Sequence, residues 1–489
     1  MKKDIKTNVL QDSTTLRQVM ERLNAGVFGI VFIVDANQVV KGILTDGDVR
    51  RSLLAGAQLE STVTEYMNTK FVHGKVSAPH AENVALLNER VRHVPLLDDL
   101  GRLVDFLSWA EMIRLPLMEP SLGGNELKYV SDCITTGWIS SQGEYVRRFE
   151  QQFSDFLEGS KCVAVSNGTA ALHLALKALD IGPGDEVIVP DLTFAATANV
   201  VLHCGAKPIC ADVDPITWTI DPNKIEKLIT PNTKAIIPVH LYGHPCDMDP
   251  ILEIAAKHKI FVVEDCAEAQ GATYKGRLVG TIGDFGCFSF FSNKVITTGE
   301  GGMVSSACQV LADKVKVLRD HGMTPGKRYW HDIAGFNYRM TNMQAAVGVA
   351  QMERVDKFLS RRKEIGQRYI LKLSSIKGLT LPPKVQWAET VYWIFSLLVD
   401  EEITGIQRDD LAKKLSDVGI ENRPFFYPMH VQPPYLQDGD FDVSKRLSLQ
   451  GMSLPSGNEI SNEEIDRVCN AIESIISEQK HHPAMRDLA

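Results

Sequence analysis

The sequence predicts an α/β protein: a main body with a mainly parallel sheet, a smaller α+β lobe after it, and an α+β pair before it. Over residues 117–365, short apolar runs alternate with helical stretches, which is typical of a parallel sheet covered by helices. Over residues 366–480 the pattern changes to helices with a few short strands. Residues 1–116 contain an internal repeat, and residues 481–489 form an uninformative tail.

Composition excludes several classes of protein. A chain of 489 residues corresponds to roughly three domains of about 150 residues each. The net charge of −9 argues against a nucleic-acid coat or a polybasic membrane binder. No apolar run approaches the ~18 residues of a membrane helix, and the N-terminus lacks the apolar core of a signal peptide. The nine cysteines show no C-x-x-C pair and no metal-ligand spacing, so we expect reduced, mostly buried thiols in a cytoplasmic protein.

The N-terminal repeat is the first element of the fold. Residues 31–48 align with residues 94–111 at a constant offset of 63 residues, without a gap. Each copy, over about 4–56 and 62–115, predicts a helix, an apolar strand, a polar turn, a second apolar strand and a helix start. At that start a hydroxyl residue is followed three positions later by a carboxylate. This pair is good helix-capping chemistry, which needs no ligand.

The repeat resembles a CBS-domain pair. In that family the positions of Thr45 and Asp48 commonly hold the ribose and phosphate of an adenine or guanine nucleotide. The second copy has Ser108 and Glu111 at these positions, and Asp105 where the first copy has Gly42. The resemblance therefore implies either a structural module or a regulatory one, with a nucleotide effector held by the first copy.

A boundary is expected at Pro116 and Pro120, because proline favours extended backbone. Beyond it, helical stretches from Thr169, from Thr197 and near Pro250 alternate with apolar runs. Five runs predict the strands of the main sheet: CVAVS (162–166), EVIVP (186–190), KAIIPVH (234–240), IFVVED (260–265) and GCFSFF (286–291). In the last lobe, VYWIFSLLV (391–399) predicts a strand and NRPFFYPMHVQPPY (422–435) a turn-rich segment.

Ligands of such a sheet collect at the carboxyl ends of its strands, so the residues that follow each strand are candidates for a site. After the first run, a turn of small residues begins a helix at Gly168 and Thr169. The free N–H groups and dipole of this helix suit a phosphate, although the same turn could cap a helix without any ligand. After the second run, Phe194 brings an aromatic ring to the sheet edge, where a lone Phe is usually part of the core.

Charged residues end two further strands. Glu264 and Asp265 close an apolar run, and because neighbours on a strand point to opposite faces, one of them must aim into the site or the protein. A carboxylate there is costly without a cationic partner. Lys294 follows an aromatic strand and precedes the glycine-rich turn TTGEGG. Lysines are rarely buried without a function.

Together these four places match the requirements of pyridoxal phosphate (PLP). This cofactor needs a lysine for its aldehyde, a carboxylate for its ring nitrogen, a flat group for its ring face and an anion cradle for its phosphate. SNGT, VEDCAEA, SFFSNK and TTGEGG occur in the chain in the order found in nucleotide-sugar aminotransferases of the DegT/StrS type. Residues 115–480 resemble this family, a branch of the fold-type I PLP-dependent enzymes.

The resemblance implies a role for each matching residue. Lys294 is the lysine that binds the cofactor, Asp265 is the partner of the pyridinium nitrogen, and Phe194 is the stacking ring. The phosphate is held by Gly168, Thr169 and Ser289.

Two further residues take their roles from the resemblance. Glu268 occupies a place where many members have Gln near the phenolic oxygen of the cofactor, or else it is a surface acid. Asn337 lies in GFNYRMT, which matches a family segment whose Asn reaches the phosphate of the neighbouring subunit's cofactor. Otherwise this segment is an ordinary loop before a helix. The family role would require a homodimer with shared active sites.

The implied reaction moves an amino group from an amino acid, glutamate in most of the family, to a keto group of a nucleotide-linked sugar, as in polysaccharide and O-antigen biosynthesis. Lys294 would act both as covalent anchor and as acid/base catalyst. EPSLGGNE, GWISSQG, VHLYGHPCDMD, RYWHDIAGFNYRMTN and RPFFYPMH are similar to segments of members that aminate C4 of a GDP-linked 4-keto-6-deoxymannose. Such segments also recur in relatives that act on UDP- or dTDP-linked sugars.

Three alternatives to the aminotransferase stay open at this point. A keto-sugar dehydratase of the same fold would carry His at the lysine position, which Lys294 contradicts. A regulator could use an aminotransferase scaffold without catalysis. An α/β protein without this chemistry would have to explain four coincident motifs at strand ends.

Overall fold

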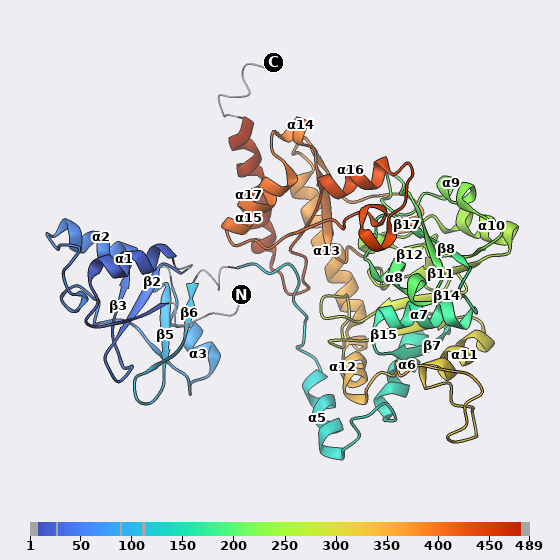
Figure 1. Cartoon of the computed structure of the whole chain (residues 1–489), viewed down its shortest axis with the longest axis horizontal. Coiled ribbons are helices and arrows are strands. Elements are labelled where there is room, and N and C mark those ends of the chain that lie inside the picture. Colours follow the sequence, from blue (N-terminus) through green and yellow to red (C-terminus); the bar gives the residue numbers. More distant parts are fainter. Residues whose placement is uncertain (1–7, 26–27, 89, 110–113, 481–489) are drawn as a thin grey trace. The chain divides into compact units, whose positions relative to one another are not determined.

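The computed structural model describes residues 8–25, 28–88, 90–109 and 114–480. The chain divides into two compact units, Met1–Leu115 and Pro116–Ala489, and each is described by itself (Figure 1). The predicted carboxylate Glu111 and the predicted tail 481–489 lie outside the described residues.

Two three-stranded sheets of the same design form the N-terminal unit. In sheet order, the first consists of β1 (Val9–Gln11), β2 (Ile30–Val34) and β3 (Val40–Thr45), and the second of β4 (Gly74–Lys75), β5 (His93–Leu97) and β6 (Leu103–Ser108). Among its described residues, the α-helices are α1 (Leu16–Ala25), α2 (Asp46–Leu54) and α3 (His80–Val84). Both bounds of β5 and of β6 follow those of β2 and β3 by 63 residues. The repeat in the sequence is therefore a repeat in the structure.

Strand β2 is buried along its whole length because it packs against a core on each face. Val31 and Ile33 join a cluster with residues of α1 and α2. Ile30 and Phe32 face the other way and join Phe106 of the second copy, whose ring centroid lies 5.1 Å from that of Phe32. Burial on both faces explains why this strand is apolar at every position.

The main sheet of the second unit has seven strands. In sheet order they are β7 (Lys161–Val165), β15 (Gly302–Ser306), β14 (Phe285–Ser289), β11 (Phe261–Asp265), β10 (Thr233–Ile236), β8 (Glu186–Pro190) and β9 (Lys207–Ala211). The pairs among β14, β11, β10, β8 and β9 are parallel, and β15 is antiparallel to both of its neighbours. The sheet is mainly parallel, as the sequence predicts.

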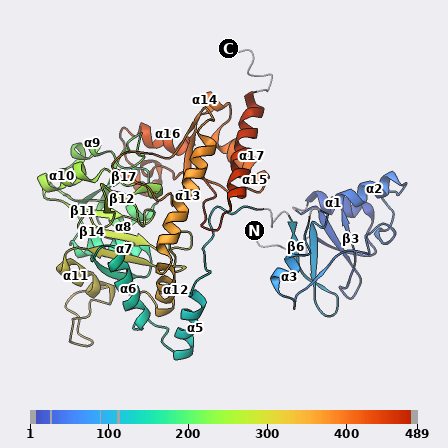
Figure 2. The same ribbon diagram turned by 180° about the vertical axis from the view of Figure 1, so that it is seen from behind.

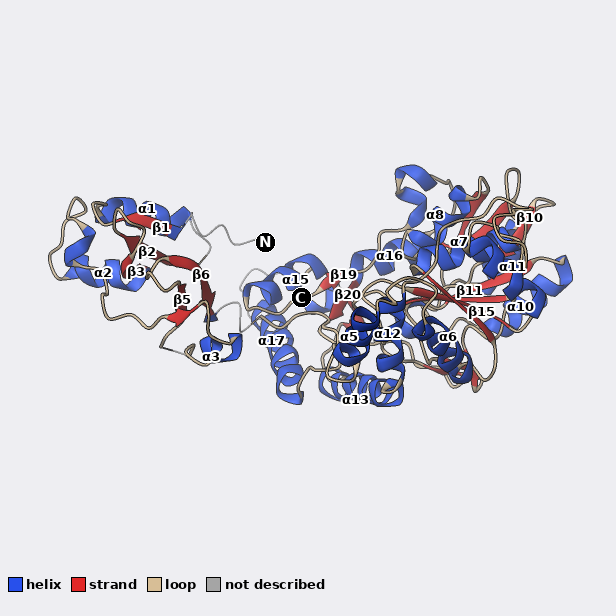
Figure 3. Ribbon diagram, turned by 90° about the horizontal axis from the view of Figure 1, so that it is seen from below, coloured by secondary structure: helices blue, strands red, loops and turns tan. Residues whose placement is uncertain are grey.

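Helices cover both faces of this sheet (Figure 3). Val163 and Val165 of β7 join a core with α7 (Gly168–Ala178), whereas Cys162 and Ala164 join a core with Phe149 of α6 (Glu144–Phe156). Alternate residues of one strand therefore meet different helices. The other helices here are α5 (Glu126–Thr136), α8 (Ala196–His203), α9 (Pro222–Ile225), α10 (Met248–His258), α11 (Gln309–Arg319) and α12 (Asn342–Met352).

Helix α13 (Val355–Leu373) leads from these helices into the C-terminal lobe (Figure 2). The sheet of this lobe is antiparallel, in the order β16 (Leu379–Thr380), β18 (Phe395–Val399), β20 (Gly451–Leu454) and β19 (Arg423–Pro424). Its helices are α14 (Glu401–Thr404), α15 (Arg408–Asp417), α16 (Asp442–Gln450) and α17 (Asn462–Lys480). A small three-stranded sheet consists of β13 (Arg277–Leu278), β12 (Thr273–Tyr274) and β17 (Ala388–Glu389).

The strand predicted over 391–399 is too long. Only Phe395–Val399 pairs in the sheet. Tyr392 has a φ of +47°, which is incompatible with a strand, and the N–H of Val391 donates to the carbonyl oxygen of Gly243 instead of to a neighbouring strand. Apolar composition alone could not reveal this bend.

All nine cysteines are free thiols, and only Cys308 is exposed. This agrees with the expectation of reduced, mostly buried thiols. Among the described residues, no helix combines the length and apolar character that crossing a membrane requires.

Candidate active site

The strand ends bring the predicted residues to one edge of the main sheet. A Cβ atom placed on Gly168, at the start of α7, would lie 2.8 Å from the Cβ atom of Ser289 at the end of β14. A Cβ atom on Gly302 would lie 2.5 Å from the backbone oxygen of Asn167. Glycine is therefore needed at both places for the segments to approach each other so closely.

Helix α7 begins directly in this crowded place. The side chain of Asn167 caps the helix by accepting a hydrogen bond from the N–H of Ala170 at 2.8 Å. Gly168 and Thr169 supply the first two N–H groups of the helix, and both residues are partly exposed. The cap shows that this turn can stabilise the helix without a ligand. The partly exposed N–H groups at the helix start still leave room for an anion.

Asp265 ends β11 and is 5% exposed. Its Oδ2 accepts a hydrogen bond from the hydroxyl of Thr197 at 2.8 Å, and its Oδ1 accepts one from the N–H of Ala267 at 3.1 Å. Burial raises the pKa of this carboxyl, whereas the two hydrogen bonds and the nearby amine of Lys294 lower it. A cation placed next to Asp265 would relieve this cost of burying its charge.

Lys294 and Glu268 face each other inside the same site. Nζ of Lys294 lies 4.0 Å from Oε1 of Glu268, whose Oε2 accepts a hydrogen bond from the N–H of Tyr242 at 2.9 Å. Burial lowers the pKa of Lys294, and burial raises the pKa of Glu268 to about 7. Glu268 is 5% exposed, so the interpretation as a surface acid is wrong.

The neighbour of Asp265, Glu264, points the opposite way and is fully buried. Its carboxylate accepts hydrogen bonds from the backbone N–H groups of Gly280, Ile282 and Gly283 at 2.8 to 2.9 Å. It also lies 3.1 Å from Nε2 of His240, whose Nδ1 accepts from the N–H of Cys246 and so leaves the ring proton on Nε2. Backbone N–H groups and a histidine therefore satisfy this carboxylate, in place of the cationic partner that the sequence suggests.

Phe194 follows β8 and is 59% exposed, so it is not a core residue. Its ring centroid lies 5.8 Å from that of Phe426, in the turn-rich segment of the C-terminal lobe. This segment is fixed to the end of β8 by Asp191, which accepts hydrogen bonds from the N–H of His430 at 2.8 Å and from Nδ1 of the same residue at 2.7 Å. The segment RPFFYPMH therefore reaches the edge of the sheet that carries the site.

Asn337 belongs to a segment that runs past the end of β7, because the N–H of Ser166 donates a hydrogen bond to the backbone oxygen of Tyr338 at 2.8 Å. It is exposed and forms an isolated bridge with Asp320 through the backbone. A free side chain at an exposed position can contact a second copy of the chain.

In the N-terminal unit, Thr45 and Asp48 form a capping box at α2. Oδ2 of Asp48 accepts hydrogen bonds from the N–H and the hydroxyl of Thr45 at 2.9 and 2.7 Å, and Oδ1 pairs with Arg51 at 2.6 Å. Both residues also line a cavity of about 570 Å³. Its cationic lining residues are Arg51, Lys70, Arg90 and Arg92. Thr45 and Asp48 therefore both cap the helix and line a cavity that suits an anionic ligand.

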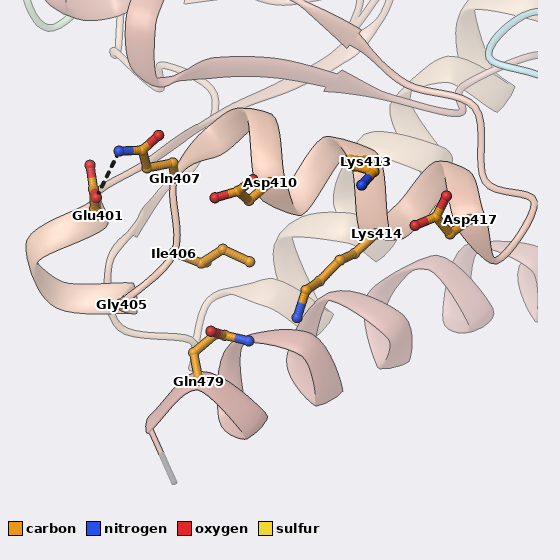
Figure 4. A pocket seen from close by; sticks show the side chains of 9 residues that line it. All are labelled: Glu401, Gly405, Ile406, Gln407, Asp410, Lys413, Lys414, Asp417 and Gln479. Atoms are coloured by element: carbon orange, nitrogen blue, oxygen red, sulfur yellow. Dashed lines mark hydrogen bonds between the residues drawn. The ribbon is translucent and has the colours of Figure 1, made fainter. Parts of the chain in front are cut away.

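A second hollow, of about 420 Å³, lies in the C-terminal lobe beside α15 and the end of α17 (Figure 4). Lys413 and Lys414 line it together with the acids Glu401, Asp410 and Asp417. Charges of both signs leave it without a preference for one class of ligand, and it contains none of the predicted residues.

Sequence reasoning missed several residues that shape the site. Thr197 follows Phe194 by three residues, so its place near the acid could have been inferred from the helical period. Tyr242 and Trp393 contact Glu268 and Lys294 from distant parts of the chain. Because these two contacts are non-local, no motif in the sequence signals them.

Comparison with known proteins adds to this geometry. The DegT/DnrJ/EryC1/StrS aminotransferase family matches residues 120–473, and the CBS domain matches residues 1–55. GDP-perosamine synthase from Caulobacter vibrioides is 47% identical over 370 residues, covering 75% of this chain and all of that protein. GDP-perosamine synthase from Vibrio cholerae is 43% identical and covers 74% of this chain and 98% of that one.

A solved structure agrees with these sequence relatives. The putative sugar aminotransferase Spr1654 from Streptococcus pneumoniae, in its PLP form, is 29% identical with a TM-score of 0.71, covering 75% of this chain and 99% of that one. This likeness confirms the predicted fold-type I architecture of the second unit. With a CBS domain at its N-terminus, the chain belongs to the DegT/DnrJ/EryC1/StrS aminotransferase family.

Proposed function

We propose that this aminotransferase uses PLP to move an amino group from an amino acid, with glutamate as the expected donor, to C4 of a GDP-linked 4-keto-6-deoxymannose. The GDP-perosamine synthases, 43% and 47% identical, support this choice of sugar and nucleotide. The observation that carries the proposal is the buried amine of Lys294, 4.0 Å from Glu268 and at the same sheet edge as Asp265.

The residues present fit PLP. The start of α7 and Ser289 form a crowded anion cradle where Cβ atoms are excluded, and Phe194 offers an exposed ring face. Asn293, beside the lysine, has a buried Oδ1 without a hydrogen-bond partner, which a bound group or water could supply. When bound, PLP supplies an aldehyde and an electron-withdrawing ring that stabilises negative charge on the reacting carbon.

Each residue of the site would have its own role toward the bound PLP. Lys294 would hold the aldehyde carbon and, once released, would move a proton to and from the reacting carbon. Its pKa, lowered by burial, leaves more of the amine unprotonated at neutral pH. Asp265 would keep a proton on the ring nitrogen, and its carboxylate charge would be balanced by that proton. Gly168, Thr169 and Ser289 would bind the phosphate.

The lysine assignment is tested by trapping. Wild-type protein loaded with PLP and reduced with borohydride should carry the cofactor mass on the peptide containing residue 294. Lys294→Ala should carry none, while Lys275→Ala, which changes an exposed surface lysine, should be labelled like wild type. Label on another side chain, or colourless reconstituted protein, would contradict the assignment.

The substrate is tested separately. The pyridoxamine form, mixed with GDP-, UDP- and dTDP-linked 4-keto sugars, should regain the absorbance of the cofactor aldehyde fastest with the GDP sugar. Equal or faster recovery with a UDP or dTDP sugar would change the substrate while leaving the aminotransferase activity intact. Loss of a hydroxyl group from the sugar, without gain of an amino group, would point to the dehydratase alternative.

We also propose a homodimer in which Asn337 reaches the cofactor phosphate of the neighbouring copy. Its exposure, in a segment next to the end of β7, supports this arrangement. Mixing inactive Lys294→Ala with weakened Asn337→Ala should then restore part of the activity, because a mixed dimer contains one site with both residues intact. No gain on mixing would contradict a role for Asn337 in the site of the neighbouring copy.

For the N-terminal unit we propose a nucleotide effector in the cavity lined by Thr45 and Asp48. The four cationic residues there support an anionic ligand, and the CBS match supports a nucleotide. Calorimetry of the full chain with adenine and guanine nucleotides should detect binding. Lys70→Glu should weaken it about tenfold or more, whereas Lys41→Glu, on the same unit but outside the cavity, should not. If calorimetry detected no heat of binding with any nucleotide, the role left for the N-terminal unit would be in assembly.

A further inference from the structure

One aromatic side chain lies directly against the amine of Lys294. Nζ lies 3.8 Å from the centroid of the Trp393 ring. Trp393 is 5% exposed and the side chain of Lys294 is 11% exposed, so the contact is shielded from water. A cation over the face of an indole is attracted by the ring's negative face, and more strongly when it is desolvated. The ring therefore forms one wall of the place where the amine rests.

Trp393 also fixes the backbone that carries this lysine. Its indole Nε1 donates a hydrogen bond to the backbone oxygen of Asn293 at 2.7 Å. Asn293 directly precedes Lys294, so one side chain holds both the backbone before the lysine and the nitrogen at its far end. Restricting both ends reduces the number of positions the amine can occupy.

The support of Trp393 comes from α13. Arg362 is 1% exposed and donates a hydrogen bond to the backbone oxygen of Trp393 at 2.9 Å. The preceding residue, Tyr392, has a φ of +47°, and its ring packs so closely on Gly366 that a Cβ atom there would lie 2.5 Å away. The bend that delays the start of the predicted strand to Phe395 is therefore also the element that presents the indole to the lysine.

We propose that Trp393 is a positioning residue for Lys294, holding the ε-amino group against its ring whenever that group is not bonded to the cofactor and favouring its protonated form. This inference rests on the proposed function, in which Lys294 works both as anchor and as free acid/base. Glu268 and Asp265 are the acids that face the same amine, and both favour the charged form. Burial acts in the opposite direction and lowers the pKa of Lys294.

The test measures protonation of Lys294 in the cofactor-free full chain. Acetylation by acetic anhydride requires the neutral amine, so the labelling rate at residue 294, followed by mass spectrometry across a pH series, gives a midpoint. Replacing all six tryptophans biosynthetically with a fluorinated tryptophan weakens the negative ring face while keeping the shape. The midpoint should fall by about one pH unit, because the protonated form loses its partner.

Substitutions separate the two contacts. Trp393→Leu removes both the ring face and the N–H and should lower the midpoint, whereas Trp393→Phe keeps an aromatic face and should retain part of the effect. Trp387→Leu is the matched control, since Trp387 packs on Tyr274 in a different cluster. It should leave the midpoint unchanged. If Trp393→Leu does not fold, the fluorinated protein still gives the answer.

An unchanged midpoint in the fluorinated protein would overturn the proposal. A rise in Trp393→Leu would do so too, because the ring would then act only by keeping water away from the amine. Failure of borohydride trapping at residue 294 would instead overturn the proposed function. Trapping is measured on wild-type protein loaded with PLP, so the two failures can be distinguished.

Discussion

The cavity of the N-terminal unit and the site at the edge of the main sheet both contain a hydroxyl beside a carboxylate, but the two pairs are built differently. Thr45 and Asp48 are three residues apart and satisfy each other within one turn of helix. Thr197 and Asp265 are 68 residues apart and meet only through the fold. The first pair is complete without a ligand, whereas the second holds a charge in the interior at a cost.

The two sites also differ in how far their charged groups are exposed to solvent. The side chain of Asp48 is 22% exposed and that of its partner Arg51 is 73% exposed, so water screens their charges. Asp265 and Glu268 are each 5% exposed, next to the amine of Lys294. Electrostatic interactions are stronger away from water, so substitutions in the main site should have the larger effects.

The largest expected effect is on turnover. Asp265→Ala should lower the rate by about 10³-fold or more, because several kcal/mol of stabilisation of the charged ring is lost. Asp48→Ala, the same change in the N-terminal unit, should leave turnover within about twofold when no nucleotide is present. Rates of amino transfer measured on both variants check this contrast, and near-normal turnover by Asp265→Ala would remove the role assigned to that acid.

The next effect is on stability. Glu264→Gln places an amide N–H₂ group among backbone donors that now point at carboxylate oxygens, which should lower the free energy of unfolding by about 3 kcal/mol or more. Glu226→Gln is the control, because this acid pairs with Lys257 and His258 at the surface and should cost about 0–1 kcal/mol. Denaturant titration of both variants measures the difference. Equal losses would mean that the buried network adds no more than a surface pair.

The architecture was predictable from the sequence because its signals are local. The offset of 63 residues recurs in the bounds of the strands, and the five predicted runs each overlap a strand of the main sheet. Strands β9 and β15 were not predicted, since KPICA and GMVSS carry Pro, Gly and Ser, which are common in turns. The bend at Tyr392 was missed because a positive φ at a non-glycine residue leaves no mark in the composition.

The site was predictable as a set of residue types and not as a set of contacts. Strand-end positions identified Asp265 and Lys294, and the partners of the buried acid Glu264 were expected to be cationic. The structure instead satisfies Glu264 with backbone N–H groups of residues 280–283 and with His240. Backbone donors are the same in every sequence, so only the fold shows which acid they will surround.

A smaller effect should appear as a pH dependence of stability. Burial raises the pKa of Glu268 from 4.5 to about 7, so between these values the folded chain keeps a proton that the unfolded chain has lost. Stability therefore falls as the pH rises from about 4.5 to 7 and levels off above that. In cofactor-free protein, Glu268→Gln should remove this slope. At pH 8 its free energy of unfolding should exceed that of wild type by about 3 kcal/mol, measured by denaturant titration.

Comparison of the two proteins at several pH values checks the sign. At pH 4.5 their free energies of unfolding should nearly coincide, because wild-type Glu268 is then protonated in the folded state. A wild-type stability that instead rises between pH 4.5 and 7, relative to Glu268→Gln, would mean that the amine of Lys294 outweighs burial and that Glu268 is ionised in the free site.

The smallest effect compares one motif in both units. Thr45→Ala and Thr341→Ala each remove the hydroxyl of a capping box, at α2 and at α12, and each should cost about 1 kcal/mol. Hydrogen exchange of the amides at each helix start should accelerate about fivefold in the unit that carries the change and not in the other. Only Thr45 also lines a cavity with cationic residues, so only Thr45→Ala should weaken nucleotide binding in calorimetry. If both variants bound nucleotide like wild type, the hydroxyl of Thr45 would act as a cap alone, and the cationic residues would have to hold the ligand without it.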